Sequence, residues 1–471
     1  MGGGRRAGLE AGPALIRALT AAAVLAATLP SLAQAASWTG TFRVPAKAEQ
    51  VTLSLELTAG RATVALGPGH MGRTAVPATN RAGRVRFTLP GGVVFDGRRS
   101  GRALAGTVRQ GSLRGTFRLT PGSSRVLPAL GLYRAADGAA VAIVQAIGLP
   151  TWLVELPSGD IHGLNAKLTT VGTRLGNTSG AGTLAVTPSR VTWARAGAGK
   201  QYARVRLHQR EVRVGVDAAT LTLPDGLGPF PAVVMTHGSG PQSREEFQVF
   251  AAFCELLGIA VIADDKRGIG QSRGMYPGER AVPSTIDVLA RDAQAEARYL
   301  ATLPQIDRTR IGVLGDSQAG WIIALAAARE PLFRWAVPLA GPTATVDETD
   351  AWGELAGQGQ APKSGTDAEM LAQVRAGGRG GFDPVPYLRK LRIPVHWVFA
   401  DDDRNVPTQL CIERLQPLQA GHDFTWSTIH ATHTLLELPS GLNADIPRSR
   451  GFGSTLFPAV SAWLTEHKIA R

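Results

Sequence analysis

One serine on a sharp turn between two apolar segments constrains the fold of this chain more than any other feature. An apolar run at residues 311–314 leads into the segment GDSQAG at 315–320, and an apolar helix is expected over residues 317–328. A G-x-S-x-G turn between a strand and a helix lifts its serine above the sheet and places helix N–H groups beside the hydroxyl. The turn predicts that Ser317 is a nucleophile, although Ala319 stands where the last motif glycine is usual.

The sequence from residue 209 to residue 471 has one regular pattern of secondary structure. Apolar strands alternate with helical patterns, which predicts a mostly parallel sheet with helices on both faces. Sites in such sheets lie at the carboxyl ends of the strands. The apolar period fades over residues 342–387, where Gly, Gln, Asp and Thr become frequent. We therefore expect a catalytic domain over 209–471 with a lid or cap insert at 342–387.

The residues in front of this domain have a β-type pattern. Apolar and polar residues alternate with a period of two over residues 36–122, with frequent glycine turns. This predicts a β-sandwich or barrel-like accessory domain. The β pattern is weaker over residues 123–208, which are expected to form a β-rich linker or a second small β module.

The first 35 residues have the pattern of a secretory signal peptide. Arginines precede an apolar stretch of 12 residues at 18–29, and the small residues AQA follow at 33–35. We therefore expect a periplasmic or secreted mature protein without a transmembrane segment.

Cys254 and Cys411 lie in apolar patterns and are expected to be buried free thiols, although export would permit a disulfide.

The net charge of +13 is concentrated near the N-terminus. Residues 37–135 contain 15 basic residues, 14 of them arginine, against three acidic ones, a net charge of +12. Such a module can contact an anionic polymer or the cell envelope, or it can be an arginine-rich solvated surface. It contains no basic helix and no nucleic-acid motif, so no nucleic-acid partner is expected.

Two further loops follow apolar strands. The segment HGSG at 237–240 is similar to the HG-x loop with which serine hydrolases hold an oxyanion. His237 itself is expected to be structural. The segment DDKRGIGQS at 264–272 is similar to a D-x-R-G-x-G-x-S loop and is expected to support the site rather than contact substrate. Its matching residues are Asp265, Arg267, Gly268, Gly270 and Ser272.

A serine nucleophile needs a base, and the base needs a group that orients it. Three carboxylates, Asp401, Asp402 and Asp403, follow an apolar strand, and Asp401 is best explained as part of a solvated turn. Two histidines, His430 and His433, lie about thirty residues further on. The residues alone leave the choice within each group open.

These motifs make residues 209–471 similar to the dienelactone-hydrolase and prolyl-oligopeptidase-like group of exported bacterial α/β-hydrolases, many of which are serine carboxylesterases. The resemblance implies an α/β-hydrolase fold, a mostly parallel sheet flanked by helices with a lid insert, preceded by an all-β N-terminal region. That front region resembles accessory segments that precede such hydrolases in exported bacterial proteins, and it carries no catalytic residues.

The resemblance also selects among the candidate residues. The acid of the family precedes a Val-Pro pair by two intervening residues, which selects Asp403 over Asp402. The late histidine of the family corresponds to His433, with His430 as the alternative. Ser317, Asp403 and His433 would then form a catalytic triad. The backbone amides of Ser239 and Gln318 would hold the oxyanion.

The function implied is a serine hydrolase, most simply a carboxylic ester hydrolase that acts on small or short-chain esters. A prolyl-oligopeptidase-like serine peptidase is the alternative, although a front region of about 170 residues is too short for a full propeller. A non-catalytic envelope- or glycan-binding protein is a third possibility. No metal and no organic cofactor is implied, and the only expected substrate is a small-molecule ester.

Overall fold

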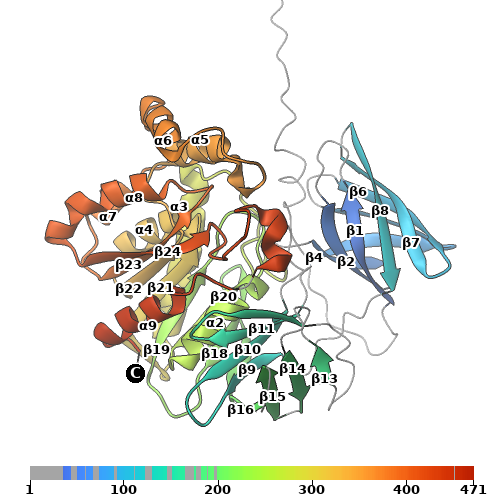
Figure 1. The fold of residues 1–471 in the computed structure, drawn as a ribbon, viewed down its shortest axis with the longest axis horizontal. Coiled ribbons are helices and arrows are strands. Elements are labelled where there is room, and N and C mark those ends of the chain that lie inside the picture. The colour runs from blue at the N-terminus through green and yellow to red at the C-terminus, as the bar shows by residue number, and fades with distance from the viewer. Residues whose placement is uncertain are drawn as a thin grey trace, which may run out of the picture.

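The computed structural model describes residues 36–43, 50–58, 60–66, 74–89, 93–110, 112–121, 130–145, 151–164, 174–176, 182–187, 189–195, 199–449 and 451–470. The predicted signal peptide at 1–35 lies outside the described residues. The described strands form a closed barrel and two eight-stranded sheets (Figure 1). No helix in the described ranges is both long and apolar enough to cross a bilayer.

The N-terminal region is an antiparallel barrel of eight strands that closes where β1 pairs with β8. Alternate side chains face inward, as the period of two predicts, and Phe42, Phe87, Phe95 and Phe117 pack together inside with ring centroids 4.9–5.5 Å apart. The strands are β1 (Ala36–Arg43), β2 (Gln50–Thr58), β3 (Arg61–Leu66), β4 (Thr74–Arg81), β5 (Arg84–Leu89), β6 (Val93–Ser100), β7 (Ala103–Gln110) and β8 (Leu113–Pro121).

The second sheet packs against the C-terminal region. One of its faces, which includes Val144 and Trp152, joins the apolar core around helices α2 (Gln248–Leu256) and α9 (Leu456–Glu466). The other face, which includes Trp193, forms a core of its own. The sheet order is β12-β11-β10-β9-β16-β15-β14-β13. The bounds are β9 (Gly131–Arg134), β10 (Ala140–Gln145), β11 (Thr151–Leu156), β12 (Ile161–Leu164), β13 (Arg174–Gly176), β14 (Gly182–Val186), β15 (Arg190–Arg195) and β16 (Lys200–Arg204).

The third sheet has the order β17-β18-β20-β19-β21-β22-β23-β24. The hairpin β17–β18 is antiparallel and β18 runs antiparallel to β20, while the remaining neighbours are parallel. This arrangement confirms the predicted α/β-hydrolase fold. The bounds are β17 (His208–Val214), β18 (Asp217–Leu223), β19 (Phe230–Thr236), β20 (Ala260–Asp264), β21 (Ile306–Asp316), β22 (Phe333–Leu339), β23 (Val395–Asp402) and β24 (Phe424–Thr432).

Helices cover both faces of this sheet. Helices α3 (Pro283–Ala301), α4 (Ala319–Arg329) and α8 (Thr408–Leu415) contribute to the core on one face. Helices α2 (Gln248–Leu256) and α9 (Leu456–Glu466) contribute to the core on the other. Burial on both faces explains why β19, β20 and the end of β21 are apolar without alternation.

The insert between β22 and β23 is helical. It contains α5 (Val346–Ala356), α6 (Asp367–Ala376) and the short α7 (Val385–Leu388), and α5 and α6 lie together at the top of Figure 1. Both longer helices begin with a complete capping box, Thr345 with Glu348 and Thr366 with Glu369. These boxes set where each helix starts.

Glycines allow the turn at Ser317 to form between crowded neighbours. A Cβ on Gly315 would collide with the carbonyl oxygen of Thr236 and lie 2.6 Å from the Cβ of Ala319. A Cβ on Gly320 would lie 2.7 Å from the backbone at Gly341. The side chain of Ala319 is therefore tolerated because glycine stands at both crowded positions.

We expect Gly320→Val to lower the melting temperature of the protein, because its branched side chain would meet rigid backbone. Overpacking of this kind costs about 1–3 kcal/mol or more. The matched control is Gly421→Ala, since a Cβ there meets no atom within 4 Å. Thermal denaturation followed by circular dichroism measures both. Equal melting temperatures for the Gly320 variant and the wild type would contradict the close approach of α4 to the backbone at Gly341, which follows β22.

Candidate active site

Ser317 occupies the turn between β21 and α4 in a backbone conformation that L-residues rarely adopt. Its φ is +53°, in the left-handed region. Two backbone hydrogen bonds hold the turn: the Ser317 N–H donates to the Leu339 carbonyl, and the Gly320 N–H donates to the Ser317 carbonyl, both at 2.9 Å. Such strain persists where the surroundings fix the backbone, and it is common at functional sites.

The structure brings Ser317, His433 and Asp403 into one hydrogen-bonded chain. His433 Nε2 lies 3.0 Å from Ser317 Oγ, and His433 Nδ1 lies 2.9 Å from Asp403 Oδ2. The three residues follow β21, β24 and β23. Because these strands are parallel, their carboxyl ends meet at one edge of the sheet, which gathers side chains that are far apart in the sequence.

Asp403 is fixed from two sides. Its Oδ1 accepts hydrogen bonds from the backbone N–H groups of Asn405 and Val406, both at 2.8 Å, and its side chain is only 1% exposed. The indole N–H of Trp352 donates to the Asp403 carbonyl at 2.9 Å. The carboxylate is therefore held with its second oxygen toward the imidazole.

The electrostatics favour a protonatable His433. Burial opposes the charged imidazole, but the charge and hydrogen bond of Asp403, with Asp316 nearby, raise the pKa of His433 above its ordinary value. With the proton of the neutral ring on Nδ1 facing Asp403, Nε2 is free to accept the proton of the Ser317 hydroxyl. This chain can therefore convert a hydroxyl into a nucleophile.

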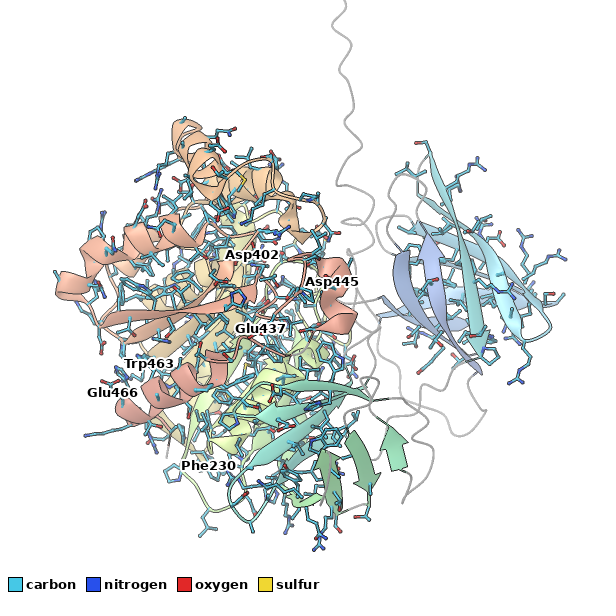
Figure 2. All side chains as sticks on the ribbon, in the orientation of Figure 1. Phe230, Asp402, Glu437, Asp445, Trp463 and Glu466 are labelled. Atoms are coloured by element: carbon cyan, nitrogen blue, oxygen red, sulfur yellow. The ribbon has the colours of Figure 1, made fainter. Side chains whose placement is uncertain are left out.

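The alternative residues lie elsewhere. His430 Nδ1 contacts Asp401 Oδ2 at 2.9 Å, and the His430 side chain is 83% exposed, against 18% for His433. Asp402, labelled in Figure 2, is the last residue of β23, and the Nζ of Lys363 in the insert lies 3.1 Å from its Oδ1. The described contacts join neither His430 nor Asp402 to Ser317.

The HGSG loop lies directly against the nucleophile. A Cβ on Gly238 would come within 2.7 Å of Asp316 Oδ2 and 3.3 Å of the Ser317 Cβ. Among the described residues, the backbone N–H groups of Ser239 and Gln318 donate to no acceptor. His237 is turned away from the hydroxyl, because its Nε2 bonds the Asp264 carbonyl at 2.8 Å. The loop can therefore offer amides to an anion beside Ser317.

The D-x-R-G-x-G-x-S loop is tied into the structure behind the site. Asp265 accepts hydrogen bonds from Arg244 and from the backbone of Gln271, and Arg267 pairs with Asp292. Its Ser272 hydroxyl donates to the Asp265 carbonyl and accepts from the backbone N–H of Ala218. These contacts are those of a supporting loop.

A cavity of about 340 Å³ opens at Ser317 and His433. The second sheet supplies part of its wall, with Val144 and Trp152. No residue of 342–387, the segment expected to form a lid, lines this cavity. The remaining lining residues are Ser239, Gln242, Glu245, Glu246, Gln248, Val249, Phe250, Asp316, Asn405, Thr434, Leu436, Asn443, Ile446 and Phe452.

One part of this cavity is acidic. Burial, together with the nearby charge of Asp316, raises the pKa of Glu246 to about 7. Burial also raises the pKa of Asp316. Carboxylates that share a partly desolvated cavity favour a cationic group as their neighbour.

Several residues of the cavity wall carry no signal in the sequence. Nothing in the local pattern of Val144 or Trp152 marks either residue as part of a catalytic wall.

The described residues contain no group of three or more His, Cys, Asp or Glu side chains placed to hold a metal ion. Cys254 and Cys411 are free and buried, as the sequence predicts.

Comparison with known proteins gives one family model, one curated relative and several solved structures to which this chain is similar. A family model described as serine aminopeptidase, S33, matches residues 228–363. Esterase EstD of Thermotoga maritima is 31% identical over 119 residues, which are 23% of this chain and 26% of the esterase. The match therefore spans about a quarter of that relative's length.

Solved structures are similar at lower identity. Dienelactone hydrolase from Anabaena variabilis is 16% identical, with 56% of this chain and 98% of that chain covered and a TM-score of 0.36. Acylaminoacyl peptidase from Pyrococcus horikoshii is 13% identical, with 89% and 80% covered and a TM-score of 0.42. The strand order of the third sheet and the turn at Ser317 are those of the α/β-hydrolase fold, and the matched family model agrees with this fold.

Proposed function

We propose that this protein is a serine hydrolase that cleaves small or short-chain carboxylic esters by acyl transfer. The observation that carries the proposal is the hydrogen-bonded chain from Asp403 through His433 to Ser317. The apolar part of the cavity wall suits a short acyl or alcohol group, and its volume of about 340 Å³ suits a small molecule.

In the first half of the reaction, Ser317 Oγ attacks the ester carbonyl while His433 Nε2 takes its proton. Asp403 holds the imidazole in the required tautomer and stabilises its positive charge. The carbonyl oxygen becomes an oxyanion, for which the amides of Ser239 and Gln318 are the proposed donors. One such donor is worth about 10²–10³-fold in kcat.

In the second half, His433 gives its proton to the leaving alcohol, and an acyl group remains on Ser317. A water molecule then attacks the acyl carbonyl and gives a proton to His433. Breakdown of this second intermediate returns the proton to Ser317 and releases the acid. No step requires a group beyond these side chains, the two amides and water.

A serine peptidase of the same mechanism is the second candidate. The acidic lining of Glu245, Glu246 and Asp316 favours it, because these carboxylates would attract the α-ammonium group of a peptide. The family model described as serine aminopeptidase agrees with this candidate.

We further propose that the barrel contacts an anionic polysaccharide. Its β5–β8 strands carry exposed arginines, and two pairs lie directly opposite each other, Arg84 with Arg98 and Arg109 with Arg114. Like charges in this position are destabilising unless an anion lies between them. Asp96 pairs with Arg84 and compensates only part of this charge. Export of the protein stays a prediction from residues 1–35.

The triad is tested with Ser317→Ala, His433→Ala and His430→Ala. Loss of Ser317 should abolish labelling by a fluorophosphonate probe and lower turnover of p-nitrophenyl acetate about a millionfold. His433→Ala should be almost as inactive, while the control His430→Ala should keep wild-type activity. An active His433 variant beside an inactive His430 variant would reverse the choice of base.

Faster cleavage of aminoacyl p-nitroanilides than of esters would favour the peptidase.

The wall formed by the second sheet is tested with Trp152→Leu. The smaller side chain should enlarge the cavity, so that the preferred p-nitrophenyl ester has a longer acyl chain. Each methylene changes the activation free energy of a substrate by about 1–3 kcal/mol in such a pocket. The control is Trp193→Leu, which changes the opposite face of the same sheet. kcat/KM over an acyl-chain series is the measurement. An unchanged chain-length optimum in the Trp152 variant would place substrate elsewhere.

The anionic partner is tested with heparin as the probe. The double variant Arg109→Glu/Arg114→Glu should elute from a heparin column at lower salt than the wild type, because binding depends on the local positive charge. The control double variant, Arg308→Glu/Arg334→Glu, changes the net charge equally on the third sheet, at exposed positions. Equal elution of the two variants would reduce the effect to net charge and reject the barrel site.

A further inference from the structure

Lys266 is a buried cation with an unusual set of partners. Its side chain is 1% exposed, and in the described part of the chain it forms no ion pair. Its Nζ instead donates to the carbonyl oxygens of Gly238 at 2.6 Å and Gly240 at 3.0 Å, and to Gln318 Oε1 at 3.3 Å. The ring centroid of Tyr276 lies 5.8 Å away. Burying a charge without an ionic partner is costly, so a role is expected.

The three oxygens belong to the segments that would hold the oxyanion. Gly238 and Gly240 flank Ser239, and Gln318 follows the nucleophile. The Gly238 carbonyl and the Ser239 N–H belong to one peptide group. In a trans peptide these two bonds point in opposite directions. A lysine that holds the carbonyl on its own side therefore turns the Ser239 N–H to the other side.

We propose that Lys266 is a positioning residue of the oxyanion hole, which fixes the Gly238–Ser239 peptide so that its N–H faces the carbonyl oxygen attacked by Ser317. The positive charge lies at the negative end of this peptide dipole, and it strengthens the N–H as a donor. The proposal rests on the acyl-transfer function proposed above. It assigns a role to a side chain that contacts neither substrate nor the triad.

Without the ammonium, the peptide loses what holds its carbonyl. Gly238 and Gly240 carry no Cβ, so the backbone on either side of Ser239 can rotate, and the Gly238 carbonyl can turn toward the cavity and remove the donor. Loss of one oxyanion donor lowers kcat by about 10²–10³-fold. The effect falls on the transition state, since the charge on the oxygen develops only there, and KM changes little.

The charge of Lys266 also predicts a pH dependence. Burial lowers the pKa of Lys266 to about 8. The cation is present below this pH and is lost as the pH rises through it, so kcat/KM should fall on the alkaline side. The acidic side is set by His433, which must be neutral to act as base. The charged or titratable groups around Lys266 are Asp264, Asp292, Glu296, Asp316, Glu279, His237 and Tyr276.

The experiment compares the full-length wild type with Lys266→Met and Lys266→Arg, and with the exposed Lys390→Met as a control. The first measurement is the rate at which a fluorophosphonate labels Ser317, because this reaction also builds negative charge on an oxygen and needs no known substrate. The second is kcat and KM for p-nitrophenyl acetate from pH 5 to pH 10. Circular dichroism and melting temperature show whether each variant is folded.

We expect folded Lys266→Met to lose about 100-fold in labelling rate and kcat with KM within a few-fold, and Lys390→Met to match the wild type. Lys266→Arg should retain part of the rate, with its alkaline fall moved to higher pH because guanidinium stays charged. A folded Lys266→Met with wild-type rates would overturn the proposal. If that variant does not fold, a wild-type kcat/KM that stays level from pH 8 to pH 10 overturns it.

The two proposals fail in different ways. If the wild type is labelled at Ser317 but hydrolyses no ester, the ester function is rejected, while the labelling rates of the variants still test Lys266. If esters are cleaved and Lys266→Met labels at the wild-type rate, only the role of Lys266 is rejected.

Discussion

The parallel alignment of β21, β22, β23 and β24 is the constraint on which the site depends. These strands all run in the same direction and end at the same edge of the sheet. The residue that follows each strand therefore lies at that edge. Ser317, Asp403 and His433 follow three of them, and His433 lies 116 residues from Ser317 in sequence. The backbone hydrogen bonds of the sheet therefore determine how far apart the side chains of Ser317, Asp403 and His433 lie. Contacts between neighbours in the sequence could not bring these residues together.

The features predicted from sequence were those with a local physical cause. The turn at Ser317 needs small residues around it, and the apolar strands need burial on both faces; both leave marks in adjacent residues. The helices of the insert also left such marks in the segments TVDE at 345–348 and TDAE at 366–369, although the weak apolar period concealed them. The fold class was predictable for this reason.

Other features depend on contacts between distant segments, and no periodicity records them. Trp152 belongs to an unremarkable β pattern, and only the packing of the second sheet brings it to the cavity. Lys266 occupies the unspecified second position of the D-x-R-G-x-G-x-S motif. Its partners are mainly backbone carbonyls, which every residue type has, so the sequence does not reveal them. The prediction of a lid or cap at 342–387 rests on the place of this insert between two strands, and that place does not fix the direction in which the insert packs.

The second sheet gives the chain one more property. Its inner face shares an apolar core with α2 and α9, and Arg134 donates to the Leu256 carbonyl at 2.8 Å across this boundary. A chain cut at residue 208 would present that apolar surface to water, at about 25 cal/mol for each Å² exposed. Such a cut would therefore destabilise the catalytic half, and the two parts of the intact chain should melt together in a single transition.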